Sequence, residues 1–197
     1  MSTTGRNDDE TGQSDDRDPA YPPEAEVGEV LVTEAEIVRR THEIGAQITA
    51  DLAGEVPLLV GVLKGSVIFA ADLMRAIAGP VELDFLAVSS YGSETKSTGV
   101  VKILKDLDNE IAGRHVILIE DIVDSGLTLR YLMSYLRGRQ PASVRACTLL
   151  LRQGDHNEDL DIDYVGFSLP PSFVVGYGLD ARQKYRNLPY IAVYTGD

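Results

Sequence analysis

Short runs of apolar, largely β-branched residues alternate along this chain with segments whose apolar residues recur at helical spacing. The runs that predict strands are 58–63, 81–88, 100–104, 115–119 and 144–151, with short ones near Val165, Val174 and Ile191. The segments that predict helices are 33–48, 67–78 and 129–136. This alternation favours an α/β fold, with a mainly parallel sheet flanked by helices on both faces. Ligand sites in such sheets lie at the carboxyl ends of strands, so the loops after residues 63, 88, 119 and 151 are candidates.

Local signals mark the ends of these helices. Thr33 and Glu36 have the spacing of a capping box, which predicts that the first helix begins after Thr33. Ile37, Ile44 and Ile48 then follow on one face. Gly79-Pro80 predicts the end of the second helix.

Composition excludes several classes of protein. The chain has 197 residues, 44% of them hydrophobic, and a net charge of −13, which predicts one acidic domain with a sizeable core. That charge argues against a sequence-independent nucleic-acid binder. No apolar run approaches the roughly 20 residues of a membrane helix, and no signal peptide is expected. Cys147 is the single cysteine and the three histidines are scattered, so neither a disulfide framework nor a cysteine zinc cluster is possible within the chain. A soluble, cytoplasmic protein is expected.

Residues 1–24 differ from the rest of the chain. They are rich in Ser, Thr, Gly and Pro, and they carry seven acidic residues against two arginines. Such a segment cannot bury enough apolar surface to offset the entropy of ordering. The sequence therefore predicts a disordered acidic tail over 1–24 and a single domain over 25–197.

The segment that carries most chemical information is 116–128, with the sequence VILIEDIVDSGLT. An apolar strand runs into Glu120 and Asp121, Asp124 follows, and Ser125 and Gly126 lead into a helix. A turn with free backbone N–H groups before a helix N-terminus predicts an anion site. Adjacent carboxylates can accept from vicinal hydroxyls or hold Mg²⁺. A lone acidic pair would more simply be solvated, but the complete segment favours a ligand with a phosphate, a diol and a metal.

This segment resembles the phosphoribosyl pyrophosphate signature of the type I phosphoribosyltransferases. Leu63-Lys64-Gly65, Ser89-Ser90-Tyr91-Gly92, Phe173 to Asp180 and Tyr185-Arg186 resemble the purine-salvage branch of that family, and the likeness spans about residues 28–194. The resemblance implies the fold of that family, with a small hood built from the chain ends. It also implies transfer of ribose 5-phosphate from phosphoribosyl pyrophosphate to N9 of hypoxanthine or guanine, with release of pyrophosphate.

The resemblance also implies a role for each matching residue. Asp124 matches the acid/base residue that handles the proton at purine N7, although an acid at the start of a helix would also stabilise the helix dipole. Ser125, Gly126, Leu127 and Thr128 match the 5′-phosphate cradle. Glu120 and Asp121 match the acids that meet the ribose hydroxyls and Mg²⁺, and Asp180 matches a further magnesium ligand.

Other matches lie outside that segment. Lys64, Gly65 and Arg186 match pyrophosphate contacts, and the family often has a cis peptide bond before that lysine. Phe173 and Val174 match the base pocket, although Phe-Val-Val alone would indicate a core strand. Residues 89–99 match a mobile lid, with Ser90 and Tyr91 near the pyrophosphate.

One position departs from the family pattern. Arg152 stands where the family usually has a lysine that donates to the purine 6-oxo group. Arginine is also a permanent cation, but it is longer and planar. We expect it to keep the preference for 6-oxopurines over adenine and to shift the ranking of hypoxanthine, guanine and xanthine.

Three alternatives remain open at this point. The first is a preference for xanthine and guanine. The second is an RNA-binding, nucleotide-sensing regulator on the same fold, against which the acidic charge counts. The third is an inactive module that binds phosphoribosyl pyrophosphate, against which the retained acids count. The expected partners are phosphoribosyl pyrophosphate and a 6-oxopurine, without nucleic acid or membrane, and the family implies a homodimer or homotetramer.

Overall fold

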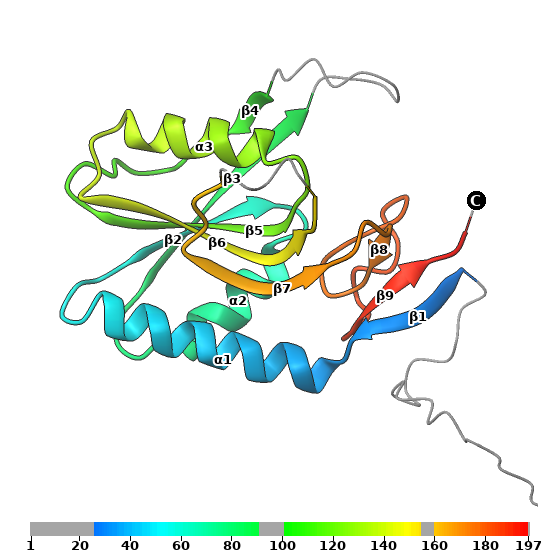
Figure 1. Cartoon of the computed structure of the whole chain (residues 1–197). Helices are drawn as coiled ribbons and strands as arrows, with labels where there is room; N and C mark the ends of the chain where they lie inside the picture. Colours follow the sequence, from blue (N-terminus) through cyan, green and yellow to red (C-terminus); the bar gives the residue numbers. More distant parts are fainter. Residues whose placement is uncertain (1–25, 91–100, 155–159, 197) are drawn as a thin grey trace, which may run out of the picture.

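The structure is a computed structural model that describes residues 26–90, 101–154 and 160–196 (Figure 1). The tail predicted over residues 1–24 and most of the lid predicted over 89–99 lie outside the described residues. Within them the strands are β1 (Val27–Val32), β2 (Leu58–Leu63), β3 (Glu82–Ser90), β4 (Val101–Lys105), β5 (His115–Val123), β6 (Ser143–Arg152), β7 (Tyr164–Leu169), β8 (Val174–Val175) and β9 (Ile191–Tyr194). The helices are α1 (Glu34–Asp51), α2 (Val67–Ala76) and α3 (Leu127–Arg137).

Six of these strands form one sheet in the order β4-β3-β2-β5-β6-β7. All neighbours pair in parallel except β4, which is antiparallel to β3. Helices α1 and α2 cover one face of the sheet and α3 covers the other (Figure 1). The predicted fold class is therefore confirmed.

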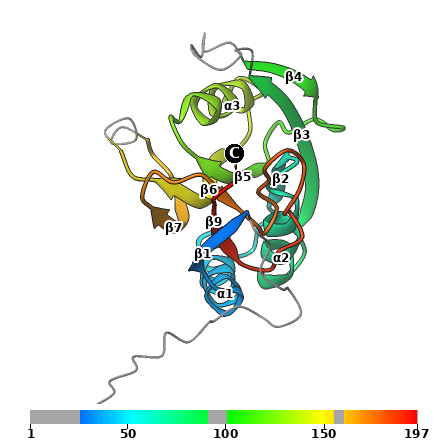
Figure 2. The same cartoon turned by 90° about the vertical axis from the view of Figure 1, so that its right-hand side faces the viewer.

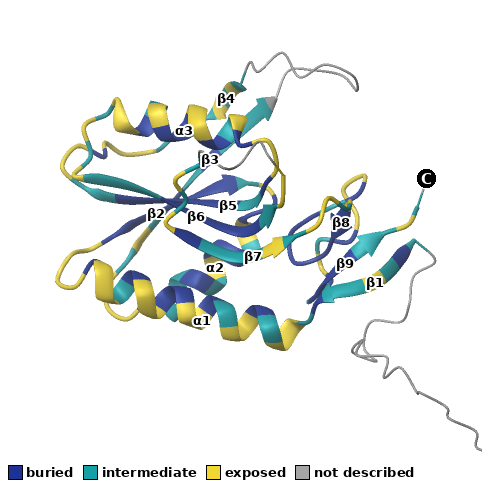
Figure 3. Cartoon of the chain, viewed as in Figure 1, coloured by how far each residue is buried: buried dark blue, intermediate teal, exposed yellow. Residues whose placement is uncertain are grey.

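Strand β5 shows how one sequence builds both halves of the core. Ile117 and Ile119 pack with the cluster beneath α1 and α2, whereas Val116 and Leu118 pack with the cluster beneath α3. All four side chains are fully buried, as are most residues of the central strands (Figure 3). A strand buried on both faces needs a continuous apolar run, which the sequence provides.

The first helix begins where the capping box predicts. Glu36 N–H donates to Thr33 Oγ1 at 3.3 Å, and Thr33 N–H donates to Glu36 Oε2 at 2.9 Å. Ile37, Ile44 and Ile48 are buried against the sheet. No helix of the described residues is long and apolar enough to cross a membrane.

A second, antiparallel sheet of order β1-β9-β8 joins the two ends of the chain. It encloses a small core of its own that includes Val175, Tyr185 and Ala192. This hood lies beyond the end toward which the parallel strands run (Figure 1), and it faces the viewer in Figure 2. The hood expected from the family resemblance is confirmed.

Most predicted element boundaries shift by a residue or two, and two of the differences bear on the candidate site. Strand β5 continues past Ile119 to Val123, because Ile122 and Val123 keep pairing with β6 and Val123 is buried. The two carboxylates therefore lie within the strand and not in a loop after it. Ser89 and Ser90 likewise belong to β3, where they pair with Lys102 and Val101 of β4.

Candidate active site

The parallel sheet opens between β2 and β5. These strands pair only as far as Gly61 and Ile119, after which β2 continues beside β3 and β5 continues beside β6. The chain also changes direction here, since β3 lies on one side of β2 and β5 on the other. Crevices at such switch points are where open α/β sheets bind ligands.

Glu120 lies on β5 beside this opening. Its side chain is buried, and its Oε1 atom has no hydrogen-bond partner among the described residues. Burial, and then the neighbouring charge of Asp121, raise the pKa of Glu120 well above its usual value. A buried acceptor without a donor is costly, so this oxygen is available to a hydroxyl, a water or a metal ion carried by a ligand.

Asp121 connects β5 to the turn after β2. A Cβ atom added to Gly65 would lie 1.5 Å from Asp121 Oδ2, so only glycine fits there. Burial raises the pKa of Asp121; the charge of Arg186 lowers it and that of Asp180 raises it further. Asp121 therefore lies within electrostatic reach of both residues, which come from the hood.

The turn after β5 forms a cavity of about 190 Å³. Its lining includes the polar side chains of Glu120, Asp124, Ser125 and Thr128 and the backbone of Gly126. The apolar lining residues are Val62, Val88, Ile122, Val123 and Leu129. The N-cap of α3 is Gly126, with φ +71° and no side-chain cap, so Asp124 does not cap this helix. The first backbone N–H groups of α3 therefore have no capping side chain at the N-terminus of the helix. The side chain of Leu127 is exposed and does not line the cavity.

Arg152 links the two predicted base-site segments. Its Nη1 forms an ion pair with Asp124 Oδ2 at 3.1 Å, and its Nη2 donates to the carbonyl of Ser172 at 2.9 Å. The next residue, Phe173, is 54% exposed and packs edge-on against Tyr194, while Val174 is buried. The exposed ring of Phe173 thus follows directly after Ser172, whose carbonyl accepts from Arg152.

The turn after β2 meets the hood. The peptide bond between Leu63 and Lys64 is cis, as in the family that the sequence resembles. A Cβ atom on Gly178 would lie 2.1 Å from the Gly65 carbonyl, so the two turns touch through their backbones. Arg186 forms an ion pair with Asp180 at 2.5 Å and donates to the Gly178 carbonyl at 2.7 Å.

The predicted magnesium ligands are carboxylates, which suit a hard cation. Among the described residues, no three His, Cys, Asp or Glu side chains could hold a metal by themselves. Mg²⁺ is commonly held by one or two carboxylates together with substrate oxygens and water, so the donor set still fits, with the free Oε1 of Glu120 as one acceptor. For the lid, Ser90 ends β3, and Tyr91 lies outside the described residues.

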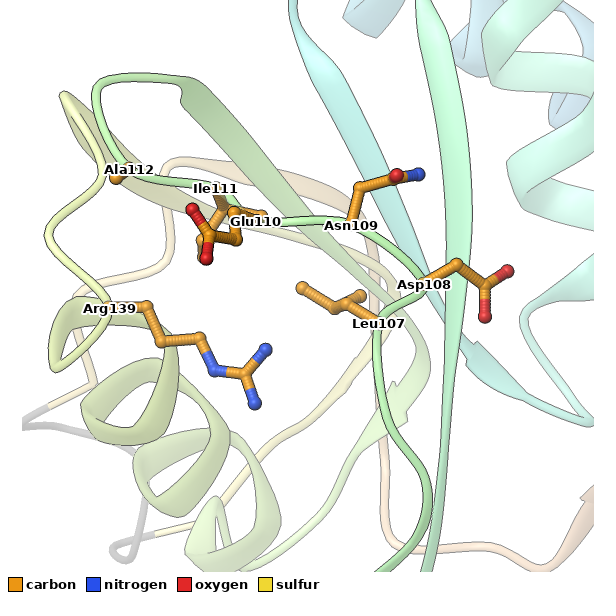
Figure 4. Close-up of a pocket in the computed structure, with 7 residues that line it drawn as sticks. All are labelled: Leu107, Asp108, Asn109, Glu110, Ile111, Ala112 and Arg139. Carbon is orange, nitrogen blue, oxygen red and sulfur yellow. The ribbon is translucent and has the colours of Figure 1, made fainter.

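A larger cavity lies elsewhere among the described residues. It measures about 500 Å³ and lies between the β4–β5 connection and Arg139, which follows α3. Figure 4 shows Arg139 extending toward the connection that carries Leu107 and Glu110. Arg139 already pairs with Asp106 and lies over the Tyr135 ring, 4.5 Å from its centroid. The 190 Å³ cavity at the crevice is therefore the better candidate for the active site, although it is smaller.

Two polar groups at the site were not found from the sequence. Gln183 accepts from Lys64 and Arg186, and the Ser172 carbonyl holds Arg152. An exposed glutamine in a turn and a backbone carbonyl carry no sequence signal, so only the structure reveals them.

Comparison with known proteins gives the family. Residues 30–182 match the model of the phosphoribosyl transferase domain. A hypoxanthine-guanine phosphoribosyltransferase of Streptococcus mutans is 51% identical over 174 residues, which cover 88% of this chain and 97% of that protein.

Similar solved structures belong to the same group of enzymes. A Bacillus anthracis hypoxanthine-guanine phosphoribosyltransferase, with HEPES in its active site, superposes with a TM-score of 0.81 at 46% identity, covering 85% of this chain and 99% of that one. A Trypanosoma cruzi hypoxanthine phosphoribosyltransferase in complex with IMP gives 0.81 at 38% identity, covering 88% and 97%. The chain therefore belongs to the phosphoribosyl transferase family, in the branch of the hypoxanthine-guanine phosphoribosyltransferases.

Proposed function

We propose that this chain is a purine-salvage enzyme that transfers the 5-phosphoribosyl group from phosphoribosyl pyrophosphate to N9 of hypoxanthine and guanine. The products are IMP or GMP and pyrophosphate. The observation that carries the proposal is the meeting, at one crevice, of three features. They are a buried carboxylate oxygen without a hydrogen-bond partner among the described residues, an uncapped helix N-terminus and the Asp124–Arg152 pair. The activity named for its relatives supports it.

The ribose and its phosphate belong in the 190 Å³ cavity. The first N–H groups of α3, with the hydroxyls of Ser125 and Thr128, donate to the 5′-phosphate, which the helix dipole also favours. Gly126, with its left-handed backbone, lets the chain turn sharply at this point. Leu127 contributes its backbone N–H. Glu120 and Asp121 accept from the ribose hydroxyls at the floor of the crevice.

The purine lies between Phe173 and Arg152. The exposed Phe173 ring stacks on the base, and the backbone of Val174 meets its edge. Arg152 donates to the 6-oxo group. Asp124 accepts the proton from purine N7 as N9 forms its bond to C1′ and the C1′–pyrophosphate bond breaks. In the structure Arg152 rests on Asp124, so the entering base separates the pair and engages both side chains.

The leaving pyrophosphate lies between the turn after β2 and the hood. Lys64 and Arg186 supply positive charge there, and the backbone of Gly65 allows close approach, with Ser90 and Tyr91 closing this end. When bound, Mg²⁺ neutralises part of the charge on the substrate oxygens, and Glu120, Asp121 and Asp180 would hold it. This neutralisation matters in a chain whose net charge is −13.

The assembly and location follow the family. We propose a homodimer or homotetramer that acts in the cytoplasm on a free base and phosphoribosyl pyrophosphate, without nucleic acid.

The test is pyrophosphate release by the purified chain with phosphoribosyl pyrophosphate and Mg²⁺. Hypoxanthine, guanine, xanthine, adenine and uracil are supplied in parallel. Turnover of hypoxanthine and guanine that a chelator abolishes is the expected result. Turnover restricted to xanthine and guanine would reassign the base preference. Binding of phosphoribosyl pyrophosphate without turnover of any base would favour the nucleotide-sensing regulator on the same fold.

The Arg152→Lys variant tests the base contact separately. We expect it to retain turnover and to change the hypoxanthine-to-guanine ratio of kcat/KM by about threefold to tenfold, because lysine is a point donor and arginine is planar. An unchanged ratio would place Arg152 away from the base.

A further inference from the structure

The turn over residues 181–184 has unusual residues at its two central positions. Ala181 and Lys184 exchange backbone hydrogen bonds of 3.3 and 3.0 Å, which closes a tight turn. Arg182 and Gln183 between them have φ angles of +53° and +67°. Turns with positive φ at both central residues strongly favour Gly, Asn and Asp, because other side chains are strained there. A long side chain kept at a strained position suggests a use for that side chain.

The side chain of Gln183 connects the two cations assigned to the pyrophosphate. Its Oε1 accepts from Lys64 Nζ at 3.2 Å and from Arg186 Nη2 at 3.4 Å. Both neighbours are donors only, so the amide oxygen must face them. The backbone N–H and Nε2 of Gln183 donate to Asp180 Oδ2 at 2.8 and 3.4 Å, and Asp180 in turn pairs with Arg186.

A neutral acceptor suits this position better than a carboxylate would. Lys64 and Arg186 come from turns far apart in the sequence and would repel each other when brought together. The amide oxygen offers both a hydrogen bond without cancelling either charge. Gln183 therefore adds no negative charge of its own beside the two cations, although Arg186 also pairs with Asp180 at 2.5 Å. Neither cationic side chain has to be ordered when the anion arrives.

We propose that Gln183 is a positioning residue that holds the Lys64 ammonium and the Arg186 guanidinium side by side for the pyrophosphate group. The proposal rests on the proposed function and names a residue outside the signature motifs. Gln183 acts through its neighbours and does not itself take part in bond making or breaking.

The test compares two glutamine-to-glycine substitutions. Gln183→Gly removes the shared acceptor and also relieves the backbone strain. Gln140→Gly is the matched control, because Gln140 is also exposed with positive φ (+58°), but it lies just after α3 and away from the crevice. The probe is magnesium pyrophosphate, titrated by calorimetry into the full-length protein. The KM for phosphoribosyl pyrophosphate, kcat and the thermal midpoint are measured on the same samples.

We expect Gln183→Gly to weaken pyrophosphate binding and to raise the KM by about fivefold or more, since hydrogen bonds to charged groups are lost. The kcat at saturation should change by less than about twofold, because the reacting atoms are not touched. The thermal midpoints of the two variants should agree, and Gln140→Gly should bind like the wild type.

Two results would overturn the proposal. Equal pyrophosphate affinity in Gln183→Gly and in the wild type would leave the proposed function standing and remove the role of Gln183. A lower thermal midpoint in Gln183→Gly alone, with unchanged KM, would make Gln183 a structural turn residue. If the wild type neither bound pyrophosphate nor turned over a base, the proposed function would fail, and this inference with it.

Discussion

Two of the cavities among the described residues differ in how well the carboxylate beside each is satisfied. Near the 500 Å³ cavity, Asp106 accepts from Tyr135 Oη at 2.6 Å, from Leu107 N–H at 2.7 Å and from Arg139. In the 190 Å³ cavity, Glu120 keeps a buried oxygen without a partner among the described residues. The carboxylate beside the 500 Å³ cavity is therefore satisfied within the fold, whereas the 190 Å³ cavity offers a ligand an acceptor without a partner and an uncapped helix N-terminus.

The pKa shifts of the carboxylates show the same difference. Burial opposes ionisation of both Asp84 and Asp106, yet their hydrogen bonds and cations lower the pKa of each below its usual value. For Glu120 nothing offsets burial, and the pKa rises. Carboxylates around the β3–β4 corner thus stabilise the fold, and those at the end of β5 are left for a ligand. Size alone would favour the 500 Å³ cavity over the one that these groups indicate.

The largest expected effect is on chemistry at the small cavity. Asp124→Asn removes the proton acceptor and should lower kcat by about 10²- to 10⁴-fold, measured as pyrophosphate release with hypoxanthine. The thermal midpoint should stay within a few degrees, since the Asp124 side chain is 67% exposed.

Asp108→Asn is the matched control for this variant, because Asp108 lines the large cavity and is exposed. It should keep kcat within about twofold of the wild type. If Asp108→Asn lost activity and Asp124→Asn kept it, the roles assigned to the two cavities would be reversed.

The second effect is on stability at the β3–β4 corner. Asp84 accepts from Phe85 N–H at 2.7 Å, from Asp108 N–H at 2.8 Å and from Lys105 at 3.3 Å. Asp84→Asn should lower the free energy of unfolding by about 2 kcal/mol, because a charged acceptor is lost from a buried site. Urea unfolding measures this change, and kcat should stay close to that of the wild type. A catalytic defect without a loss of stability would contradict the structural role.

The third effect is the opposite at the end of β5, where ligand binding should weaken and stability should hardly change. Glu120→Gln should weaken binding of magnesium phosphoribosyl pyrophosphate by about tenfold, since the carboxylate acceptor is gone. Its free energy of unfolding should stay within about 1 kcal/mol of the wild type, because burying a neutral amide costs less than burying a carboxylate. Calorimetry measures the change in binding, and urea unfolding measures the change in the free energy of unfolding. Strong destabilisation with intact binding would mean that Glu120 serves the fold.

The smallest effect is the acid dependence of stability. The folded-state pKa values of Asp84 and Asp106 lie below those of the unfolded chain, so their contribution is complete above about pH 5. It is lost progressively as the pH falls through about 4 toward the folded values. Asp84→Asn should therefore flatten the fall in stability between about pH 5 and 3. An unchanged slope would show that Asp84 is not held in its charged form.

Local patterns predicted much of the scaffold. The capping box at Thr33 marked the start of α1, and the apolar runs marked β2, β5 and β6, because these signals act over a few residues. The end of β5 was misplaced because a pair of acids normally signals the surface. Here pairing with β6 and burial of Val123 carry the strand onward.

The residues themselves indicated only the part of the candidate site that stands together in the chain, and the scattered positions were assigned from the family resemblance. Residues 120–128 could be recognised as one segment, and the structure places most of them around one cavity. The contacts between segments could not be foreseen. Arg152 reaches Asp124 across 28 residues and Lys64 reaches Gln183 across 119, and nothing local encodes either meeting. Their assigned roles in binding and catalysis stay predictions until tested.

The most direct test of where the substrate binds is hydrogen exchange of the backbone amides with and without magnesium phosphoribosyl pyrophosphate. Protection is expected in residues 120–130 and 176–186, which border the crevice, while residues 105–113 and 135–140 around the large cavity exchange as before. Protection confined to 105–113 and 135–140 would contradict the account, because the ligand would then occupy the larger cavity.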